Sequence, residues 1–360
     1  MSSKKMLIVT ECFAGGVYKY LKNYCSYLES IGYSYDLIIG TKEETPDLNT
    51  IKDDFNYKNM YLQDIRKRSF KNLFQFYRTI KDVTISNSYE IVHLHSSLAG
   101  FLGRFGIKET SKKFYTPHGY SFIQLTKPLK SKIYKCIEKF INKMDKATTT
   151  IAISDSEGDL ANQVGNKVDI VKTGLTSIPS YIERRSGSSG GAVNNVISIG
   201  RLADQKNPIL FLDIAELLPS YNFTWVGDGP LRSLMEGTIR KRNLHNVTIT
   251  GWLDFSDVEK LLVADDYVYL QTSLWEGLPL TLLEALAASL PVVVMDSYGN
   301  RDVVSVGENG FICNNVEEFV ESIKIVSDKY NQFSQKSYEI VSSEYNFNKN
   351  IKKLVEIYDR

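Results

Sequence analysis

The sequence predicts an α/β protein with two domains, each a parallel sheet covered by helices on both faces. The chain has 360 residues, and domains of about 100–200 residues are the rule, so the length fits two of them. The composition, 43% hydrophobic and 24% charged, is ordinary for a globular protein. Apolar strand-like runs alternate with helical patterns along the chain, and this alternation is typical of parallel sheets joined by crossover helices.

The first half carries five predicted strands, each a short apolar run. They cover residues 6–10, 35–39, 90–95, 113–116 and 149–153. Helical patterns fill the gaps between them, for example over 17–30 and over 155–163, where Ser154 is the expected N-cap.

The second half repeats the pattern. Its predicted strands cover residues 196–199, 223–226, 247–250, 267–271 and 291–295. Its predicted helices cover residues 208–218, 231–242, 256–263 and 279–288. Two such units are Rossmann-like, and their ligand is expected in a cleft outside the carboxyl ends of the strands.

We place the first domain at residues 1–172 and the second at residues 173–342. A last helix over 343–360 is expected to join the first domain. The segment 184–191 is rich in Gly and Ser, which favours a linker between the domains or a surface loop just beyond it.

Composition and spacing exclude several classes of protein. The net charge is only +1, which disfavours a uniformly basic nucleic-acid coat protein. The four cysteines are scattered without a C-x-x-C pair, which disfavours a zinc site or a disulfide framework. No signal segment or run of about 20 apolar residues is recognisable, so we expect a cytoplasmic protein.

Basic residues are concentrated in the first domain. Residues 51–150 carry 19 Lys and Arg against 8 Asp and Glu. Bases alternate with aromatics over 66–78, and lysines recur every three or four residues over 127–146, which predicts a basic amphipathic helix. Two interpretations stay open: an apolar stripe that faces the core below a solvated lysine face, or a dock on the anionic inner face of the cell membrane. No nucleic-acid-binding motif accompanies these residues.

Glycine-rich turns follow several predicted strands. Gly15 and Gly16 open the helix after the first strand, where backbone amides favour an anion. Gly200 follows the first strand of the second half, and Arg201 and Lys206 come close behind it; two cations there suit a diphosphate. The first turn is not G-x-G-x-x-G, which disfavours a nicotinamide dehydrogenase.

The strongest signal is a Glu-x7-Glu pair, Glu276 and Glu284. Glu284 lies amid leucines and alanines of a predicted helix, so its carboxylate needs a partner such as ligand hydroxyls. Glu276 precedes that helix, whose N-terminal amides form a ready anion site. The alternative is two structural carboxylates, one of them a helix cap.

Taken in order, these motifs resemble the retaining GT-B glycosyltransferases of family four. The resemblance covers nearly the whole chain and rests on Gly15-Gly16, Thr116-Pro-His118-Gly, Gly200-Arg201-Leu with Lys206, Val226-Gly-Asp-Gly-Pro, and Glu276 with Glu284. It implies a GT-B fold, two Rossmann-like domains whose parallel sheets face each other across a cleft. The catalytic residues that it implies are His118, Arg201, Lys206 and Glu276. The substrate-binding residues that it implies are Gly15, Gly16, Gly200, Gly227, Trp252, Leu253, Gly277, Leu278, Pro279, Leu280 and Glu284.

The roles implied by the resemblance divide along the donor molecule. Arg201 and Lys206 would hold the diphosphate, Glu284 the ribose and Glu276 the donor sugar. His118 would lie beside the transferred sugar and the acceptor. Gly16 would approach the diphosphate, and the stretch around Trp252 would lie near the base.

The activity implied by the resemblance is retaining hexosyl transfer from a nucleotide-diphosphate sugar. We expect a UDP-sugar donor and a glycan or polyprenyl-diphosphate-linked saccharide acceptor, in the synthesis of a cell-surface polysaccharide. The sequence contains no Asp-x-Asp, so we expect no catalytic metal and no cofactor. Two alternatives stay open: a GT-B nucleotide-sugar epimerase, which needs no acceptor, and a sugar-nucleotide-binding protein without turnover.

Overall fold

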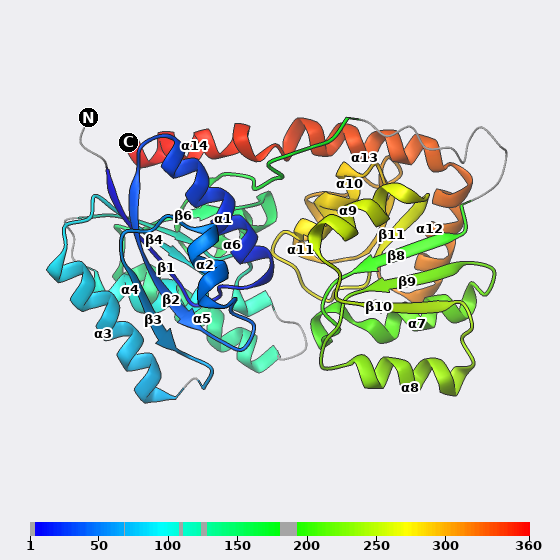
Figure 1. Ribbon diagram of the computed structural model, residues 1–360, viewed down its shortest axis with the longest axis horizontal. Helices are drawn as coiled ribbons and strands as arrows, with labels where there is room; N and C mark the ends of the chain where they lie inside the picture. Colours follow the sequence, from blue (N-terminus) through cyan, green and yellow to red (C-terminus); the bar gives the residue numbers. More distant parts are fainter. Residues whose placement is uncertain (1–3, 68, 108–110, 124–127, 181–192) are drawn as a thin grey trace. The chain divides into compact units, whose positions relative to one another are not determined.

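The computed structural model describes residues 4–67, 69–107, 111–123, 128–180 and 193–360, which form two compact units (Figure 1). The first unit comprises Met1–Thr173 and Phe347–Arg360, and the second comprises Gly174–Asn346. The segment 184–191, expected as a linker or loop, lies outside the described residues.

The first unit is built on a seven-stranded parallel sheet with the order β3-β2-β1-β4-β5-β6-β7. Its strands are β1 (Lys5–Thr10), β2 (Ser34–Thr41), β3 (Met60–Asp64), β4 (Ile91–His95), β5 (Lys112–Thr116), β6 (Thr149–Ala152) and β7 (Lys167–Ile170). The chain moves from β1 to one side of the sheet and returns with β4 on the other side. Such a reversal of strand order is where α/β sheets bind ligands.

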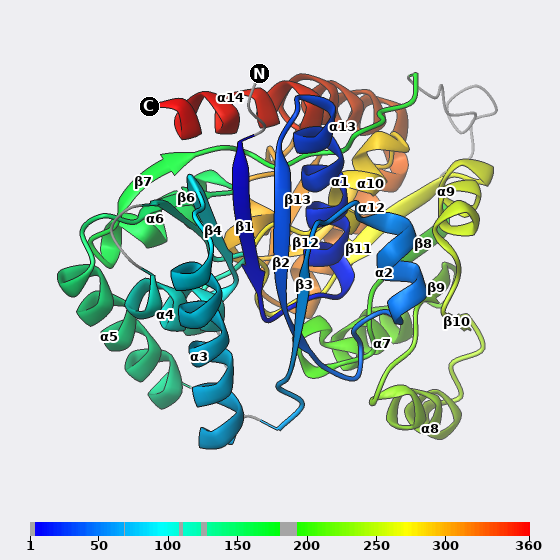
Figure 2. The ribbon, with the colours of Figure 1, turned by 60° about the vertical axis from the view of Figure 1, so that its left-hand side comes forward.

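Crossover helices and the C-terminal helix α14 cover this sheet. They are α1 (Gly15–Ser30), α2 (Leu48–Asp54), α3 (Phe70–Ser86), α4 (Ser97–Gly106), α5 (Pro128–Met144), α6 (Asp155–Gln163) and α14 (Phe347–Asp359). Helices α3, α4 and α5 follow one another along one face, while α1 and α2 lie on the other (Figure 2). The hydroxyl of Ser154 accepts a hydrogen bond from the N–H of Glu157 at 3.2 Å, which confirms the predicted N-cap of α6.

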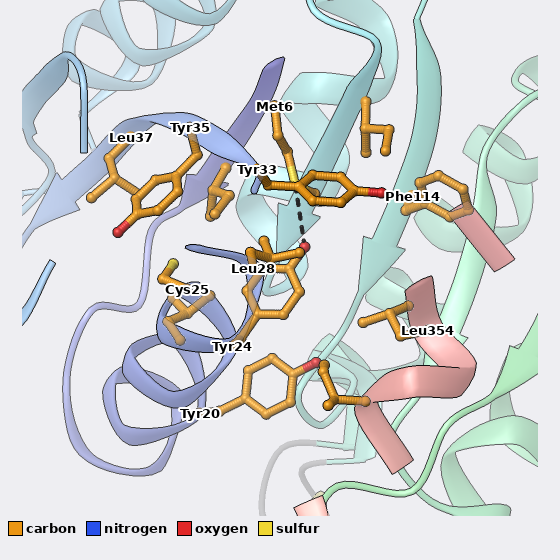
Figure 3. Close-up of a cluster of buried hydrophobic side chains, with 14 of the residues drawn as sticks. Met6, Tyr20, Tyr24, Cys25, Leu28, Tyr33, Tyr35, Leu37, Phe114 and Leu354 are labelled. Carbon is orange, nitrogen blue, oxygen red and sulfur yellow. Dashed lines mark hydrogen bonds between the residues drawn. The ribbon is translucent and has the colours of Figure 1, made fainter. Parts of the chain in front are cut away.

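The core of the first unit joins α1 and α14 to the sheet. Tyr24 of α1 is fully buried in a cluster that also contains Met6 of β1 and Leu354 of α14 (Figure 3). The hydroxyls of Tyr24 and Tyr358 lie 2.6 Å apart. Burying a large apolar side chain contributes about 1.5–3 kcal/mol, so this cluster holds α14 in the first unit although the second unit separates them in sequence.

The second unit is built on a six-stranded parallel sheet with the order β10-β9-β8-β11-β12-β13. Its strands are β8 (Asn195–Ile199), β9 (Asn222–Val226), β10 (Val247–Gly251), β11 (Tyr267–Gln271), β12 (Val292–Met295) and β13 (Gly310–Cys313). Its helices are α7 (Pro208–Leu217), α8 (Arg232–Arg242), α9 (Phe255–Ala264), α10 (Leu280–Ala287), α11 (Tyr298–Arg301), α12 (Val316–Asp328) and α13 (Tyr330–Glu344). Its core includes Trp225 and Phe211, whose rings meet edge to face.

All ten predicted strands are present, with ends displaced by at most two residues. Three strands that the sequence did not predict, β3, β7 and β13, lie at the edges of the two sheets. The residues of β3 and β7 are partly exposed and mix polar with apolar side chains, so these two lack the continuous apolar run of a central strand, whereas β13 is a run of only four residues that begins with a glycine.

One interpretation of the basic amphipathic helix is wrong. The helix is present as α5, but its apolar stripe does not face the core. Ile133, Ile137, Phe140 and Met144 are exposed, and only Ile141 of the predicted stripe is buried.

Within the described residues, no helix combines the length and the apolar character that crossing a bilayer requires.

Candidate active site

The second unit gathers most of the predicted site residues at one edge of its sheet. Its strands are parallel, so their carboxyl ends lie at the same edge. Gly200 follows β8, Gly227 follows β9, Trp252 follows β10 and Glu276 comes after β11. The strand order reverses between β8 and β11, which makes their carboxyl ends the switch point of this sheet.

An ion pair between Lys206 and Glu276 lies beside this switch point. The Nζ of Lys206 is 2.6 Å from Oε1 of Glu276, which is only 7% exposed. The side-chain amide of Gln205 donates to the other carboxylate oxygen at 3.3 Å. An ammonium group has three donors, so Glu276 can hold Lys206 in place and leave it able to bind an anion.

Hydrogen bonds to the backbone lock together the two loops that carry this pair. The N–H of Leu274 donates to the carbonyl of Gln205 at 2.8 Å, and the hydroxyl of Thr272 donates to the carbonyl of Lys206 at 2.7 Å. Asn207 ends the first loop in the left-handed conformation, with φ of 48°. These hydrogen bonds therefore fix the backbone position from which the side chain of Lys206 extends.

Glycines allow the turns after β8 and β9 to approach closely. A Cβ on Gly200 would lie 2.9 Å from Cε of Lys206, whose stem runs over this turn. A Cβ on Gly227 would lie 2.2 Å from the carbonyl oxygen of Gly200, and φ of Gly227 is +135°. Packing against backbone therefore requires glycine at Gly227, whatever ligand binds beside it, whereas a side chain at Gly200 would displace the end of the Lys206 stem.

The segment Gly277, Leu278, Pro279 leads from the ion pair into α10, which begins at Leu280. No side chain caps the N-terminus of α10, so the amides of its first turn are not taken up by a capping side chain. Glu284 lies one turn into this helix and is half-buried rather than fully buried. The positive end of the helix dipole lies beside the loop that carries the Lys206 partner.

The remaining predicted residues of the second unit lie on its surface. Arg201 is exposed, and Trp252 and Leu253 follow β10 with Trp252 65% exposed. All three come directly after strands of the same parallel sheet, so they share the carboxyl edge with Lys206. An exposed indole there offers a flat apolar surface on which a base can stack.

Gly299 is a residue of this site that sequence reasoning missed. A Cβ on Gly299 would lie 2.1 Å from the carbonyl oxygen of Gly277, and its N–H donates to the carbonyl of Glu276 at 3.4 Å. It begins no recognisable motif, because the contact joins segments that only the fold brings together.

We expect Gly299→Ala to lower the melting temperature and to abolish ligand-induced stabilisation at this site. The added methyl group cannot fit against backbone, so the loop from Glu276 to Leu280 must move. Differential scanning fluorimetry with and without a nucleotide measures both effects. The matched control is Gly237→Ala, which meets no atom within 4 Å on helix α8 and should leave the protein as stable or about 0.5–1 kcal/mol more stable. Equal melting temperatures for both variants would contradict the expectation.

The first unit holds the other predicted residues at the carboxyl ends of β1 and β5. Gly15 and Gly16 are the first residues of α1, and both are exposed. Gly15 has φ of +53°, a conformation that glycine adopts without strain. Before them, the buried carboxylate of Glu11 accepts hydrogen bonds from the N–H groups of Leu98 and Ala99, each at 2.9 Å, at the start of α4.

His118 sits in a strained turn whose shape is fixed by an acid that sequence reasoning missed. Its φ is +53°, and φ of the following Gly119 is +91°. The N–H of Gly119 donates to the carboxylate of Glu157 at 2.7 Å, and Glu157 also accepts from the N–H of Ile153 at 2.9 Å. The S-x-x-E spacing of Ser154 and Glu157 is a capping-box signal in the sequence, but nothing in it shows the link to Gly119.

Three of the four histidines form one cluster at the ends of β4 and β5. A hydrogen bond of 3.0 Å joins Nδ1 of His95 to Nε2 of His118, and the rings of His93 and His95 lie 4.1 Å apart. His93 is held by the hydroxyls of Tyr358 and Thr116 at 2.6 and 2.9 Å. The Nε2 of His95 is buried without a partner. Because Nε2 of His118 is bonded to His95, Nδ1 is the ring nitrogen of His118 that points away from the cluster.

Burial keeps this cluster neutral. It lowers the pKa of His118 to about 3 and holds the pKa values of His93 and His95 well below the usual range, with neighbouring histidines adding to the effect on these two. An imidazole that is neutral at pH 7 donates or accepts a hydrogen bond but carries no charge to a substrate. His118 is therefore suited to positioning a substrate.

We expect acid to destabilise the protein through this cluster. In the unfolded chain these histidines take up protons below about pH 6.5, whereas in the folded protein they do not. The free energy of unfolding should therefore fall as the pH drops from about 6.5 toward 4, by up to about 1.4 kcal/mol per pH unit for each histidine. Urea titrations at pH 7 and pH 5 measure it. His95→Gln should reduce the slope, whereas His245→Gln, at an exposed histidine of the second unit, should not; equal slopes in both would count against the cluster.

Comparison with known families decides what these two units are. The family described as "Glycosyltransferase Family 4" matches residues 14–176, and the family described as "Glycosyl transferases group 1" matches residues 182–340. The first match covers the first unit except β1 and α14, and the second covers most of the second unit. The chain is a family-four glycosyltransferase with the GT-B fold.

Relatives and solved structures agree with this assignment. The glycosyltransferase is 27% identical over 322 residues to an Escherichia coli enzyme named UDP-Gal:alpha-D-GlcNAc-diphosphoundecaprenol alpha-1,3-galactosyltransferase, covering 81% of this chain and 79% of that one. Its fold matches sucrose-phosphate synthase from Thermosynechococcus elongatus with a TM-score of 0.81 at 17% identity, over 99% of this chain and 98% of that one. It also matches HepE from Anabaena, solved with UDP and glucose, with a TM-score of 0.75 at 15% identity over 99% of each chain.

The predicted fold class and the enzyme class of this glycosyltransferase are confirmed. The individual site residues stay predictions. Lys206, Glu276, Gly200 and Gly227 form one connected group in the second unit, whereas His118 and the Gly15 turn belong to the first unit. Within the described residues, no group of three or more His, Cys, Asp or Glu side chains could hold a metal ion.

Proposed function

We propose that this glycosyltransferase moves a sugar from a UDP-sugar to a lipid-linked saccharide during the synthesis of a cell-surface polysaccharide, with retention of configuration and without a metal ion. The reaction would take place at the cytoplasmic face of the cell membrane. The second unit would bind the donor, and the first unit would contribute His118 and the Gly15 turn.

The observation that carries the donor site is the locked pair of Lys206 and Glu276 at the switch point between β8 and β11. A cation held by a buried acid, beside a helix N-terminus that no side chain caps, supports the binding of a diphosphate. Arg201, at the same edge of the sheet, would add a second cation.

The chemistry needs positive charge on the leaving group. As the bond between C1 of the sugar and the diphosphate oxygen breaks, negative charge develops on that oxygen, where Lys206 and Arg201 would stabilise it. The acceptor hydroxyl would attack from the same face and give its proton to the leaving phosphate, so the products are a glycosidic bond and a nucleoside diphosphate. Glu276 would act on the donor sugar mainly through the Lys206 that it holds, the neutral His118 would position the sugar and the acceptor, and Glu284 would bind the ribose.

The names of relatives support the choice of substrates. The Escherichia coli relative is named for a UDP-galactose donor and a diphosphoundecaprenol-linked acceptor. The Anabaena neighbour binds UDP and glucose, although at 15% identity it supports only the fold.

Thermal-shift measurements with UDP, GDP and dTDP test the donor, because a ligand that binds only the folded state raises its melting temperature. We expect UDP to give the largest shift, and a larger shift with GDP or dTDP would reject the UDP assignment. Transfer is then measured with lipid-linked acceptors by mass spectrometry, with and without EDTA. Conversion of the donor sugar when no acceptor is present would instead identify an epimerase, and loss of transfer in EDTA would reject the metal-free reaction.

A further inference from the structure

One face of the first unit carries an unusual density of exposed apolar side chains. This face is formed by α3, α4 and α5, which lie side by side (Figure 2). Its exposed apolar residues are Phe70 and Phe74 on α3, Phe105 on α4, and Leu129, Ile133, Ile137, Phe140 and Met144 on α5. Phe70 is 86% exposed, and its ring stacks on that of Phe74. Single exposed apolar residues are normal in soluble proteins, but several of them on neighbouring helices, five on α5 alone, indicate an interaction surface.

The apolar residues of α5 form a stripe that points away from the unit. At 3.6 residues per turn, the five residues from Leu129 to Met144 fall within about 80° of the helix circumference. The side of α5 that packs on the unit contains Glu138, Ile141 and Asn142 instead. This helix therefore has its polar contacts inside and its apolar stripe outside.

The polar contacts of α5 explain how the helix is anchored. The carboxylate of Glu138 pairs with the guanidinium of Arg104 at 2.7 Å and accepts from the hydroxyl of Tyr115 at 3.3 Å. Asn142 also bonds Arg104, and its amide donates to the carbonyl of Val164 at 3.0 Å. Because these buried groups fix the rotation of α5 about its axis, the apolar stripe faces solvent.

Lysines flank the exposed apolar stripe. Lys130, Lys132, Lys139 and Lys143 are exposed along α5, and Lys146 follows it. The one acid on this helix, Glu138, is buried and paired, so no carboxylate of α5 faces outward.

Helix α3 continues the basic character of this face. It adds Lys71, Arg78 and Lys81 against a single acid, Asp82, which pairs with Arg78.

From this arrangement we propose that the face formed by α3, α4 and α5 docks on an anionic lipid bilayer. The apolar stripe enters the boundary between headgroups and acyl chains, as in helices that lie in a membrane interface. The lysines on its flank reach the phosphate groups with their ammonium ends while their stems stay along the apolar surface. Charge complementarity selects an anionic bilayer over a neutral one, at about fivefold in affinity for each lysine near the surface.

This proposal goes beyond the transfer reaction and does not depend on its donor or acceptor. Binding to lipid is measured without either substrate. UDP binding by the second unit is measured without lipid, so the failure of one proposal leaves the other standing.

The chain provides its own probe of this face. Cys136 is exposed on α5, whereas Cys25 and Cys313 are buried. An environment-sensitive fluorophore on Cys136 should shift to shorter wavelength when vesicles of phosphatidylcholine with about 30 mol% phosphatidylglycerol are added at about 50 mM salt. Vesicles of phosphatidylcholine alone should give little shift, and about 500 mM salt should weaken the effect. Labelled Cys136→Ser protein controls for dye on Cys12, which is partly exposed.

Sedimentation with the same vesicles tests the residues. Lys132→Gln with Lys139→Gln should weaken binding roughly 25-fold, and Ile133→Ser with Phe140→Ser should weaken it at least about tenfold. The matched controls are Lys352→Gln with Lys353→Gln on α14, and Leu217→Ser with Leu234→Ser in the second unit, which should bind as the parent does. Melting temperature and UDP-induced stabilisation should be unchanged in all four.

Three results would overturn the proposal: equal binding to neutral and anionic vesicles, undiminished binding by both α5 variants, or a Cys136 response to self-association alone. The last would assign the face to a second copy of the chain.

Discussion

Lys206→Met should lower the rate of sugar transfer by about 10²- to 10³-fold, the usual cost of removing one preorganised donor from a developing negative charge. Methionine keeps the length of the stem that runs over Gly200 but lacks the ammonium group. The substitution also leaves Glu276, which is 7% exposed, without its cation, so the melting temperature should fall as well. Initial rates under saturating donor and a thermal melt measure the two effects.

Comparison with two further variants separates charge at the site from charge in general. Arg201→Met removes an exposed cation at the same sheet edge and should slow transfer with a smaller loss of stability. Lys241→Met removes an exposed lysine from the last turn of α8 and should leave transfer unchanged. Full activity in Lys206→Met would reject its role with the leaving group.

The fold could be predicted from sequence because its central strands consist mostly of apolar residues in short continuous runs. Strands β1, β4, β8 and β11 are each buried on both faces, so composition alone identifies them. The edge strands β3 and β7 are partly exposed and mix polar with apolar residues, and β13 is a run of only four residues that begins with a glycine, so the same signal is weaker in all three.

The site was predictable only as a set of separate turns. Gly200, Lys206 and Glu276 each follow a predicted strand, and parallel strands bring such turns to one edge. That Lys206 touches Glu276 rather than solvent is a contact across 70 residues, which no local pattern encodes. The packing of Gly299 on Gly277 and the bond between His95 and His118 are of the same kind.

The basic helix shows the opposite limit. The helical spacing of its apolar residues and its lysines predicted both the helix and its amphipathic character. The sequence could not show which side of the helix faces the core. The buried side of α5 is held by Glu138 and Asn142, two polar residues that a hydrophobic pattern assigns to solvent. A buried ion pair with Arg104 reverses the usual orientation.

Glu276→Gln should also slow transfer strongly, by about 10²-fold or more, because glutamine keeps a carbonyl oxygen near Lys206 but loses the charge that holds it. Both carboxylate oxygens of Glu276 already have protein partners, Lys206 on one and Gln205 on the other. We therefore expect Glu276 to act largely through the position of Lys206, and UDP-induced stabilisation to fall together with transfer.

A double-mutant cycle of Lys206→Met and Glu276→Gln distinguishes this from direct contact with the donor sugar. If Glu276 works through Lys206, the double variant should be about as slow as Lys206→Met alone, since the second substitution removes a support for a group already absent. If Glu276 binds the sugar independently, the two rate losses should multiply, and UDP affinity should survive in Glu276→Gln. The 2.6 Å contact and the burial of the carboxylate favour the first result.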